Sequence, residues 1–490
     1  MRKAITTILL LIFLMPAGVD AQEQYLENLN GKPAEKSESE KKNDRSRNVN
    51  VDMQIVYGQY NNMLSTINLS QQHEDFVYLL SSNFKRSNDF GYKNETYENT
   101  SFYENKIGFT GNMNVSDTWK SILETEVNSD SHGMYNNTVF SREEKEMVNV
   151  SLKNVSKFSS SFEGYWTLGG AEYVHRLRPI VPQDYEKSRL MQFNSEFGGE
   201  YIWSPTNRIR FSSAYFQYDY GQEGVQNDRY LCSELVDDFY ITRNFGLGLG
   251  ANLDYNRDAP LLASPVLSMT VKDYKYATIV LLYRYDLVPF KPEKYYLQQK
   301  YIRPNYDLPP QKTHHGDMKA EFRIGNLFTI KTIFAVDKSE NHYNYYTVNP
   351  GNLLSAGTLP VTHYYSKLDL SLFLLEKILE MNIVYDYSVF NAGKNVTYSP
   401  NHKLTSLLKY NGKKWKFEWT NRFVGQVYTD PESDAQIDSA IIGDFGVQRK
   451  MLESFYAYIR VENLYNNRYR LREGYPEPGI TVLGGIRILI

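Results

Sequence analysis

The sequence predicts an all-β fold, a transmembrane outer-membrane β-barrel of about 22 antiparallel strands, and three observations support this prediction. Residues 49–490 are built of segments in which apolar and polar side chains alternate, which is the pattern of strands with one apolar face. About 22 such segments can be counted, each about ten residues long, as expected for strands that cross an outer membrane. Their connections are alternately short and long, which is typical of a bacterial barrel with both termini in the periplasm.

The first residues predict a cleaved signal peptide over 1–21. Arg2 and Lys3 supply positive charge, residues 8–15 form a short apolar core, and small residues precede the expected cleavage after Ala21. A membrane anchor is the alternative, but an apolar run this short cannot span a hydrocarbon core that needs roughly 20 apolar residues. The mature chain is therefore expected to begin near Gln22.

Residues 22–48 are rich in Lys, Glu, Asn and Ser and show no apolar periodicity, which predicts a disordered polar tether. The barrel is expected to occupy 49–490. Cys232 is the single cysteine, so no internal disulfide can form, and a net charge of -3 argues against a partner that is a nucleic acid. The 41 tyrosines suit strands that end among lipid headgroups, so we expect outer-membrane lipid and the barrel-assembly machinery as partners.

The last segment shows the alternation most clearly. Ile486, Ile488 and Ile490 share one face, which we expect to meet lipid, whereas Thr481 and Arg487 fall on the other. Counting such segments along the chain places strand starts near residues 102, 119, 415 and 481. It places the start of the sixth strand near residue 147 and that of the sixteenth near 362.

Two long connections, 287–313 and 338–361, are expected to face outside the cell. Tyrosine is rigid and amphipathic, so clustered tyrosines could stack on an incoming ligand. The alternative is an aromatic girdle, or packing among the loops. The candidate ligand-binding residues in these connections are Tyr295, Tyr296, Tyr343, Tyr345 and Tyr346.

The closing residues IRVENLYNNRYRLREGYPEPGITVLGGIRILI resemble the C-terminal segment of TonB-dependent outer-membrane receptors. The stretches VYGQYNNMLSTINLS (56–70) and PNYDLPPQKTHHGDMKAEFRIGN (304–326) are similar to the first hairpin and to a later strand entry of the same family. The residues that match the family motif, to which the resemblance assigns a role in assembly, are Asn463, Leu464, Tyr465, Asn466 and Tyr469, followed by Ile486, Ile488 and Ile490 on the last strand.

The chain also departs from that family. Family members carry a plug domain before the first barrel strand, and here only 27 tether residues stand in that place. The sequence thus predicts a barrel without a plug, closed either by a separately encoded plug or by loops that fold inward. No short apolar box in the tether could pair with TonB by strand addition, so energised transport is not expected from this chain alone. Ile490 stands where family barrels often end in an aromatic residue.

His314 and His315 invite a metal hypothesis. Neighbours on a strand point to opposite faces, however, so we expect no metal site there. The run GLGLG at 246–250 lacks the following helix of a phosphate-binding loop, and small residues on a barrel strand explain it.

The acidic pairs Glu143–Glu144 and Asp237–Asp238 could in principle serve acid–base catalysis. Sequence neighbours of this kind are more often solvated or lumen-facing charge, so we expect no enzyme and no cofactor.

The resemblance implies a barrel for solute uptake or permeation across the outer membrane. Two alternatives stay open: a passive porin-like channel, and a surface-exposed adhesion or structural barrel.

Overall fold

The structure is a computed structural model that describes residues 49–490 except 74, 93–94, 182–185, 222–226, 258, 274–275, 292–299, 307, 349–352 and 376–377. The predicted signal peptide (1–21) and tether (22–48) lie outside the described residues. Within the described part of the chain, no helix is long and apolar enough to cross a membrane.

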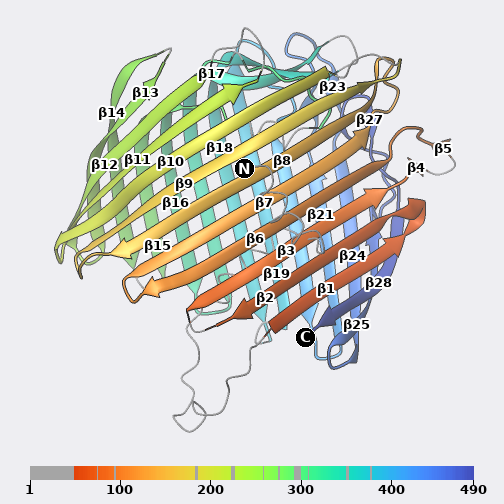
Figure 1. Ribbon diagram of the computed structural model, residues 1–490, viewed down its shortest axis with the longest axis horizontal. Coiled ribbons are helices and arrows are strands. Elements are labelled where there is room, and N and C mark those ends of the chain that lie inside the picture. Colours follow the sequence, from red (N-terminus) through yellow and green to blue (C-terminus); the bar gives the residue numbers. More distant parts are fainter. Residues whose placement is uncertain are drawn as a thin grey trace, which may run out of the picture.

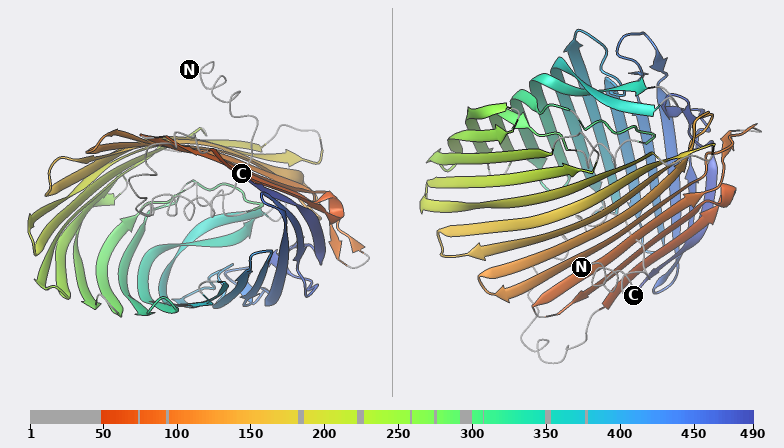
Figure 2. Two further views of the ribbon diagram at one scale, coloured as in Figure 1. Left: turned by 90° about the horizontal axis from the view of Figure 1, so that it is seen from below. Right: turned by 45° about the horizontal axis from the view of Figure 1, so that its top comes forward.

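Twenty-two strands within the described ranges form one closed antiparallel sheet, which confirms the predicted fold (Figures 1 and 2). Each strand pairs with the next along the chain, and β28 pairs with β1 to close the ring. The strands are β1 (Val49–Gly58), β2 (Met63–Gln72), β3 (Phe76–Ser87), β6 (Phe102–Ser116), β7 (Trp119–Gly133), β8 (Phe140–Lys157), β9 (Phe162–Pro179), β10 (Glu186–Ser204), β11 (Asn207–Tyr220), β12 (Asp228–Thr242), β13 (Phe245–Asn256), β14 (Ala259–Asp273), β15 (Ala277–Val288), β16 (Gln311–Ile324), β17 (Phe328–Val348), β18 (Leu353–Leu374), β19 (Leu379–Ala392), β20 (His402–Asn411), β21 (Trp415–Val424), β24 (Ala440–Leu452), β25 (Phe455–Glu462) and β28 (Thr481–Leu489).

The long connections carry short elements of their own. These are the 3₁₀ turn η1 (Gln59–Asn61) and the paired strands β4 (Gly91–Tyr92) with β5 (Glu95–Thr96), β22 (Val427–Tyr428) with β23 (Gln436–Ile437), and β26 (Arg470–Arg472) with β27 (Tyr475–Pro476).

Side chains alternate between the outside of the barrel and its lumen along each strand. On β25, Ile459 points outward and is 57% exposed, whereas its neighbour Tyr458 points into the lumen and is 9% exposed. Leu235 and Leu249 are outward-facing in the same way and more than half exposed. A closed sheet with such an apolar outer surface satisfies all its backbone hydrogen bonds internally, as lipid requires.

The connections at the two ends of the barrel differ in length. At one end they are two to four residues long, as in 117–118, 205–206 and 243–244. At the other end the connection between β15 and β16 covers 289–310. The short turns share their end with the start of β1 and the end of β28. In outer-membrane barrels this is the periplasmic end, and the long connections lie outside.

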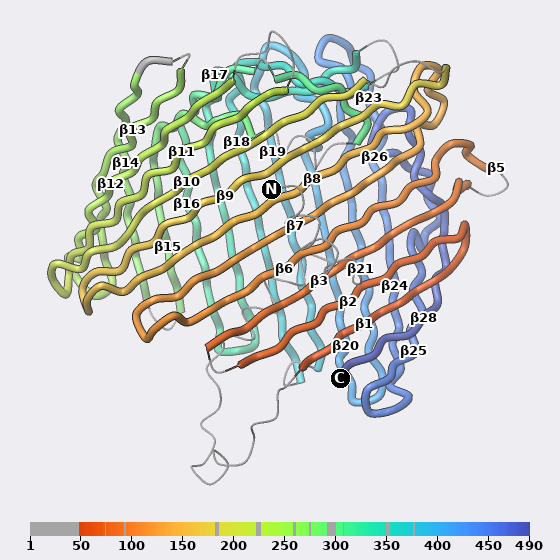
Figure 3. The backbone as a smooth tube through the Cα atoms, in the orientation of Figure 1, coloured from red at the N-terminus to blue at the C-terminus, as the bar shows by residue number. Residues whose placement is uncertain are grey.

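The first and last strands, β1 and β28, lie side by side (Figure 3). Backbone and side-chain hydrogen bonds hold this seam. The Ile490 N–H donates to the Val51 carbonyl over 2.9 Å, and the Val51 N–H donates back over 2.8 Å. In the lumen, the Arg487 guanidinium donates twice to the Asp52 carboxylate, over 2.9 and 2.7 Å. The isoleucines of β28 lie on the outward face, as the alternation predicts, since Arg487 points inward.

Two strands extend further than the sequence predicts. The sixth strand of the ring begins at Phe140 rather than near 147, and the sixteenth at Leu353 rather than near 362. Residues 338–361, predicted to be a loop, are therefore largely strand. The outer end of β8 lies beyond the apolar belt, so its outward positions carry charge, such as Glu146 paired with Arg176 at 2.7 Å. Without an apolar face, the alternation of the strand is hidden in the sequence.

The family-motif residues form the turn that follows β25. Asn463 and Asn466 adopt left-handed backbone angles, with φ of 48° and 50°. The Asn463 amide donates to the carbonyls of Asn467 and Pro478, over 2.9 and 3.0 Å. The ring of Tyr465 lies against Gly443 of β24, where an added β-carbon would sit 2.6 Å from a ring atom. The motif therefore fixes where the last long connection leaves the wall; its role in assembly stays a prediction.

Asn463→Ala should destabilise the barrel by about 1–2 kcal/mol, because alanine tolerates the left-handed region poorly and cannot make the two side-chain bonds. Urea unfolding in detergent, followed by tryptophan fluorescence, measures this. Asn463→Gly keeps the backbone conformation accessible and should cost less. Equal midpoints for the wild type and Asn463→Ala would show that the turn is not held by this residue.

Candidate functional site

The outer end of the lumen is crossed by a cap, defined here as residues 300–306 together with the outer ends of β17 and β18, 339–348 and 353–361. Figure 2 shows the two strand ends curving inside the ring rather than continuing the wall. The connection 287–313 was expected at the outer end of the barrel, and its residues 300–306 lie at that end but inside the lumen, as in the predicted alternative of loops that fold inward. They are held there by Glu143 of β8 and by the outer end of β18.

Glu143 of β8 is the anchor on the first wall. Its side chain is completely buried, and its two oxygens accept the backbone N–H groups of Tyr301 at 2.6 Å and Ile302 at 2.9 Å. Lys145 lies 3.4 Å and His175 2.9 Å from the same carboxylate. A buried carboxylate is tolerated only when charge and hydrogen bonds compensate it, and here the cap supplies two of the donors.

The inward-curving end of β18 holds the same segment from its other side. The Leu354 N–H donates to the Tyr301 carbonyl over 2.9 Å, and the Arg303 N–H donates to the Leu354 carbonyl over 2.7 Å. Asn305 donates to the Ala356 carbonyl over 2.9 Å. In the ring, β18 stands ten strands away from β8, but its outer end reaches across the lumen, since Leu353 packs against Phe140 and Leu177. Residues 300–306 thus join the β8 wall to this strand end, and the cap as a whole spans the lumen.

A stack of rings joins the cap to the last long connection. The rings of Tyr301 and Tyr475 lie 3.7 Å apart and 9° from parallel. The Arg472 guanidinium lies over both rings, at 5.4 and 5.3 Å from their centroids. Burial raises the pKa of the Tyr301 hydroxyl well above its usual range. A partly desolvated cation over two rings is a stronger contact than an exposed one.

Lys300 adds an ionic contact with the wall. Its ammonium lies 3.0 Å from the carboxylate of Glu104 on β6. Burial alone would lower the pKa of Lys300, but Glu104 and Glu477 raise it above the ordinary value. Burial raises the pKa of the Glu477 carboxyl, which lies in the last long connection. Lys300 therefore stays charged inside the lumen.

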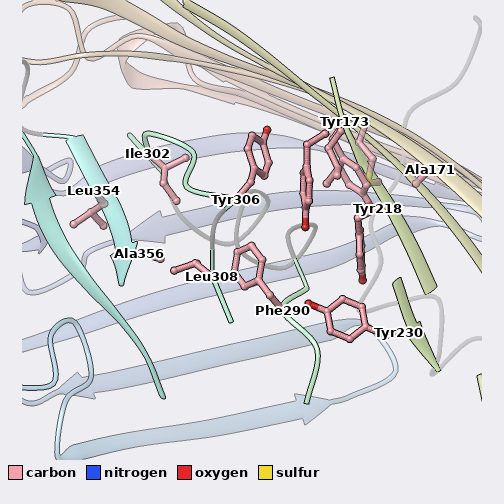
Figure 4. Packing of buried hydrophobic residues seen from close by; sticks show 13 residues of the cluster. Ala171, Tyr173, Tyr218, Tyr230, Phe290, Ile302, Tyr306, Leu308, Leu354 and Ala356 are labelled. Atoms are coloured by element: carbon pink, nitrogen blue, oxygen red, sulfur yellow. The ribbon is translucent and has the colours of Figure 1, made fainter. Parts of the chain in front are cut away.

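Apolar side chains pack beneath these polar contacts (Figure 4). One cluster joins Phe290, Ile302 and Tyr306 of the inward connection to Tyr173 and Tyr218 on the wall. Tyr306 lies 4.6 Å from Tyr220, measured between ring centroids. A second cluster joins Leu353 of the cap to Met134, Phe140, Leu177 and Tyr475. The cap is thus packed as well as hydrogen-bonded.

The tyrosines predicted as ligand contacts lie in different places. Tyr295 and Tyr296 fall outside the described residues. Tyr343, Tyr345 and Tyr346 lie on β17, within the cap, and not in a loop. Tyr343 donates to the Pro309 carbonyl over 3.1 Å, and its ring lies 5.1 Å from that of Phe290. These contacts hold the cap together, and a role in ligand binding stays a prediction.

The two adjacent histidines do point to opposite faces. His314 stacks on Tyr285 outside, with centroids 4.2 Å apart. His315 points into the lumen between Asp337 at 2.5 Å and Asp317 at 2.9 Å. Among the described side chains, no group of three or more His, Cys, Asp or Glu is placed to hold a metal ion.

The other patterns in the sequence lie on strands. Residues 246–250 belong to β13, with the glycines toward the lumen and the leucines toward the outside. Asp238 faces the lumen and pairs with Arg210 at 2.7 Å. Glu143 and Glu144 also separate, since Glu144 points outward to Arg178.

The anchoring role of Glu143 was missed by the sequence analysis, although the acidic pair was noted. Glu143 precedes the start predicted for its strand near residue 147, so no alternation in the sequence marks its side chain as lumen-facing. The partners of this carboxylate are about 160 residues away in the chain, at Tyr301 and Ile302.

The closed barrel, its apolar outer surface and its end-to-end asymmetry define an outer-membrane β-barrel protein. No protein-family model matches the chain. No curated protein matches it either.

Solved structures do resemble it. The FrpB iron transporter from Neisseria meningitidis is 11% identical and superposes with a TM-score of 0.72 over 91% of this chain and 82% of its own. The siderophore receptor PirA from Acinetobacter baumannii is 10% identical, with a TM-score of 0.69 over 90% and 80%. The copper transporter OprC is 11% identical, with a TM-score of 0.68 over 91% and 81%. At this identity the likeness shows a shared fold, a large closed β-barrel.

Proposed function

We propose that this protein is a transport barrel of the outer membrane, similar to TonB-dependent receptors, whose passage is restricted by its own cap. The observation that carries the proposal is that residues 300–306 are held between Glu143 on the β8 wall and Leu354 on the inward-curving end of β18. A lumen bounded by 22 strands is wide enough to need an occupant. An element held by a few hydrogen bonds and ion pairs can restrict passage and still be released.

The similar structures support this proposal, because they include an iron transporter, a siderophore receptor and a copper transporter. A separately encoded plug and a contact with TonB both stay predictions. The sequence also left an adhesion barrel open as an alternative. Such a barrel would let no solute through its lumen, and this difference from a transport barrel can be measured.

The test is the entry of neutral sugars into liposomes that contain the purified barrel. Tyr301→Ala removes the ring that Tyr475 and Arg472 hold, so the variant should admit a tetrasaccharide faster than the wild type does. Tyr465→Ala is the matched control, because it truncates a tyrosine that lies over Gly443 and outside the cap. If neither the wild type nor Tyr301→Ala admits any sugar faster than empty liposomes, the transport proposal fails.

A further inference from the structure

Three cavities adjoin one another along one side of the lumen. The first, of about 430 Å³, lies between the cap, the last long connection and the wall. The second, of about 330 Å³, shares Lys85, His132 and Lys300 with the first. The third, of about 220 Å³, shares Asp444 and Arg460 with the first and reaches Arg487 near the periplasmic end. Together they follow the wall from the cap toward the periplasm.

The side chains that line these three cavities carry an excess of positive charge. Ten of them are lysine or arginine, and six are aspartate or glutamate. A further cavity of about 570 Å³, on the wall formed by β9 to β12, has the opposite balance, with two basic and three acidic side chains. The positive charge is therefore a property of one wall.

The geometry of the ion pairs directs this charge into the lumen. Asp444 lies 2.6 Å from Arg422 and 4.0 Å from Arg460. The carboxylate side chain is 12% exposed, whereas the two arginine side chains are 46% and 33% exposed. Arg460 also lies 3.1 Å from Glu462. Both guanidinium groups thus stay partly exposed toward the lumen, while the carboxylate between them is shielded. Guanidinium groups bind carboxylate and phosphate oxygens in pairs.

We propose that this wall forms a basic track for solutes that carry carboxylate or phosphate groups, defined by Lys85, Lys300, Arg422, Arg460, Lys416 and Arg487. The inference rests on the proposed transport function and names its substrate class. Rows of lysine and arginine in a pore favour anions, and a charged surface inside a low-dielectric wall raises the local concentration of the opposite charge. Lys300 places the start of the track on the cap, so the same residue that closes the mouth would meet the arriving anion.

The test is the ratio of chloride to potassium permeability, taken from the reversal potential of the barrel in a bilayer under a KCl gradient. The wild type should favour chloride. The double variant Arg422→Gln/Arg460→Gln should lower the ratio by about twofold or more, and Asp444→Asn should raise it. The matched control is Arg176→Gln/Arg189→Gln, which removes two arginines from outward-facing ion pairs and should leave the ratio unchanged. A ratio that does not fall in the track variant overturns the inference.

A second measurement does not depend on conduction. Titration calorimetry of the detergent-solubilised barrel with inorganic pyrophosphate at low salt should show binding that the track variant weakens and the control variant keeps. If no variant conducts, the transport proposal fails, and the calorimetry alone decides the inference. Equal binding by the track and control variants would overturn it.

Discussion

Glu143→Ala is expected to raise the single-channel conductance of the barrel several-fold. The substitution removes the acceptor of the Tyr301 and Ile302 N–H groups and the counter-charge of the buried Lys145. Removing one partner of a buried ionic pair typically costs about 3–5 kcal/mol. A loss of that size should release residues 300–306 from the first wall and widen the passage.

Glu144→Ala is the matched control for this prediction. It removes the same side chain at the next position, but Glu144 points outward to Arg178, away from the cap. Its conductance should equal that of the wild type. If Glu143→Ala and Glu144→Ala conduct alike, Glu143 does not hold the passage closed.

Gly485→Ala is expected to give little or no closed barrel. Gly485 lies on β28 opposite Val56 of β1, where a β-carbon would sit 2.0 Å from the Ile55 carbonyl oxygen and 2.7 Å from the Val56 α-carbon. Both are backbone atoms of the partner strand, so the strand itself must move. Glycine within a strand often marks such a close approach. The seam between β1 and β28 should therefore open or fail to form.

The readout is the fraction of protein that migrates as the folded form on a gel without heating. Gly484→Ala is the neighbouring control, because no heavy atom lies within 4 Å of its added β-carbon. It should fold as the wild type does. If the two variants fold equally well, close packing at the seam is not what requires glycine at 485.

The strand order and the face of most strands could be predicted from the sequence, because lipid imposes a strict apolar alternation on each crossing segment. The predicted starts at 102, 119, 415 and 481 coincide with those of β6, β7, β21 and β28. The direction of Arg487 into the lumen follows from the same alternation.

The cap could not be predicted in this way. Its strand ends lie beyond the lipid, where no apolar–polar alternation is required. Their sequence therefore does not distinguish a strand inside the lumen from an outer loop. Seven strands, β9 to β15, separate Glu143 from Tyr301 in the chain, and nothing in the local sequence specifies that contact. The excess of basic residues on one wall is equally hidden, because Arg422, Arg460 and Arg487 come from three different strands.

Hydrogen exchange at residues 300–306, followed by mass spectrometry on the detergent-solubilised barrel, tests most directly whether the cap bridges the lumen. The N–H groups of Tyr301 and Ile302 donate to Glu143, and that of Arg303 donates to the Leu354 carbonyl, so slow exchange is expected in the wild type. Fast exchange is expected in Glu143→Ala, with β28 peptides unchanged. Exchange in the wild type as fast as that of an exposed turn would contradict a cap held across the lumen.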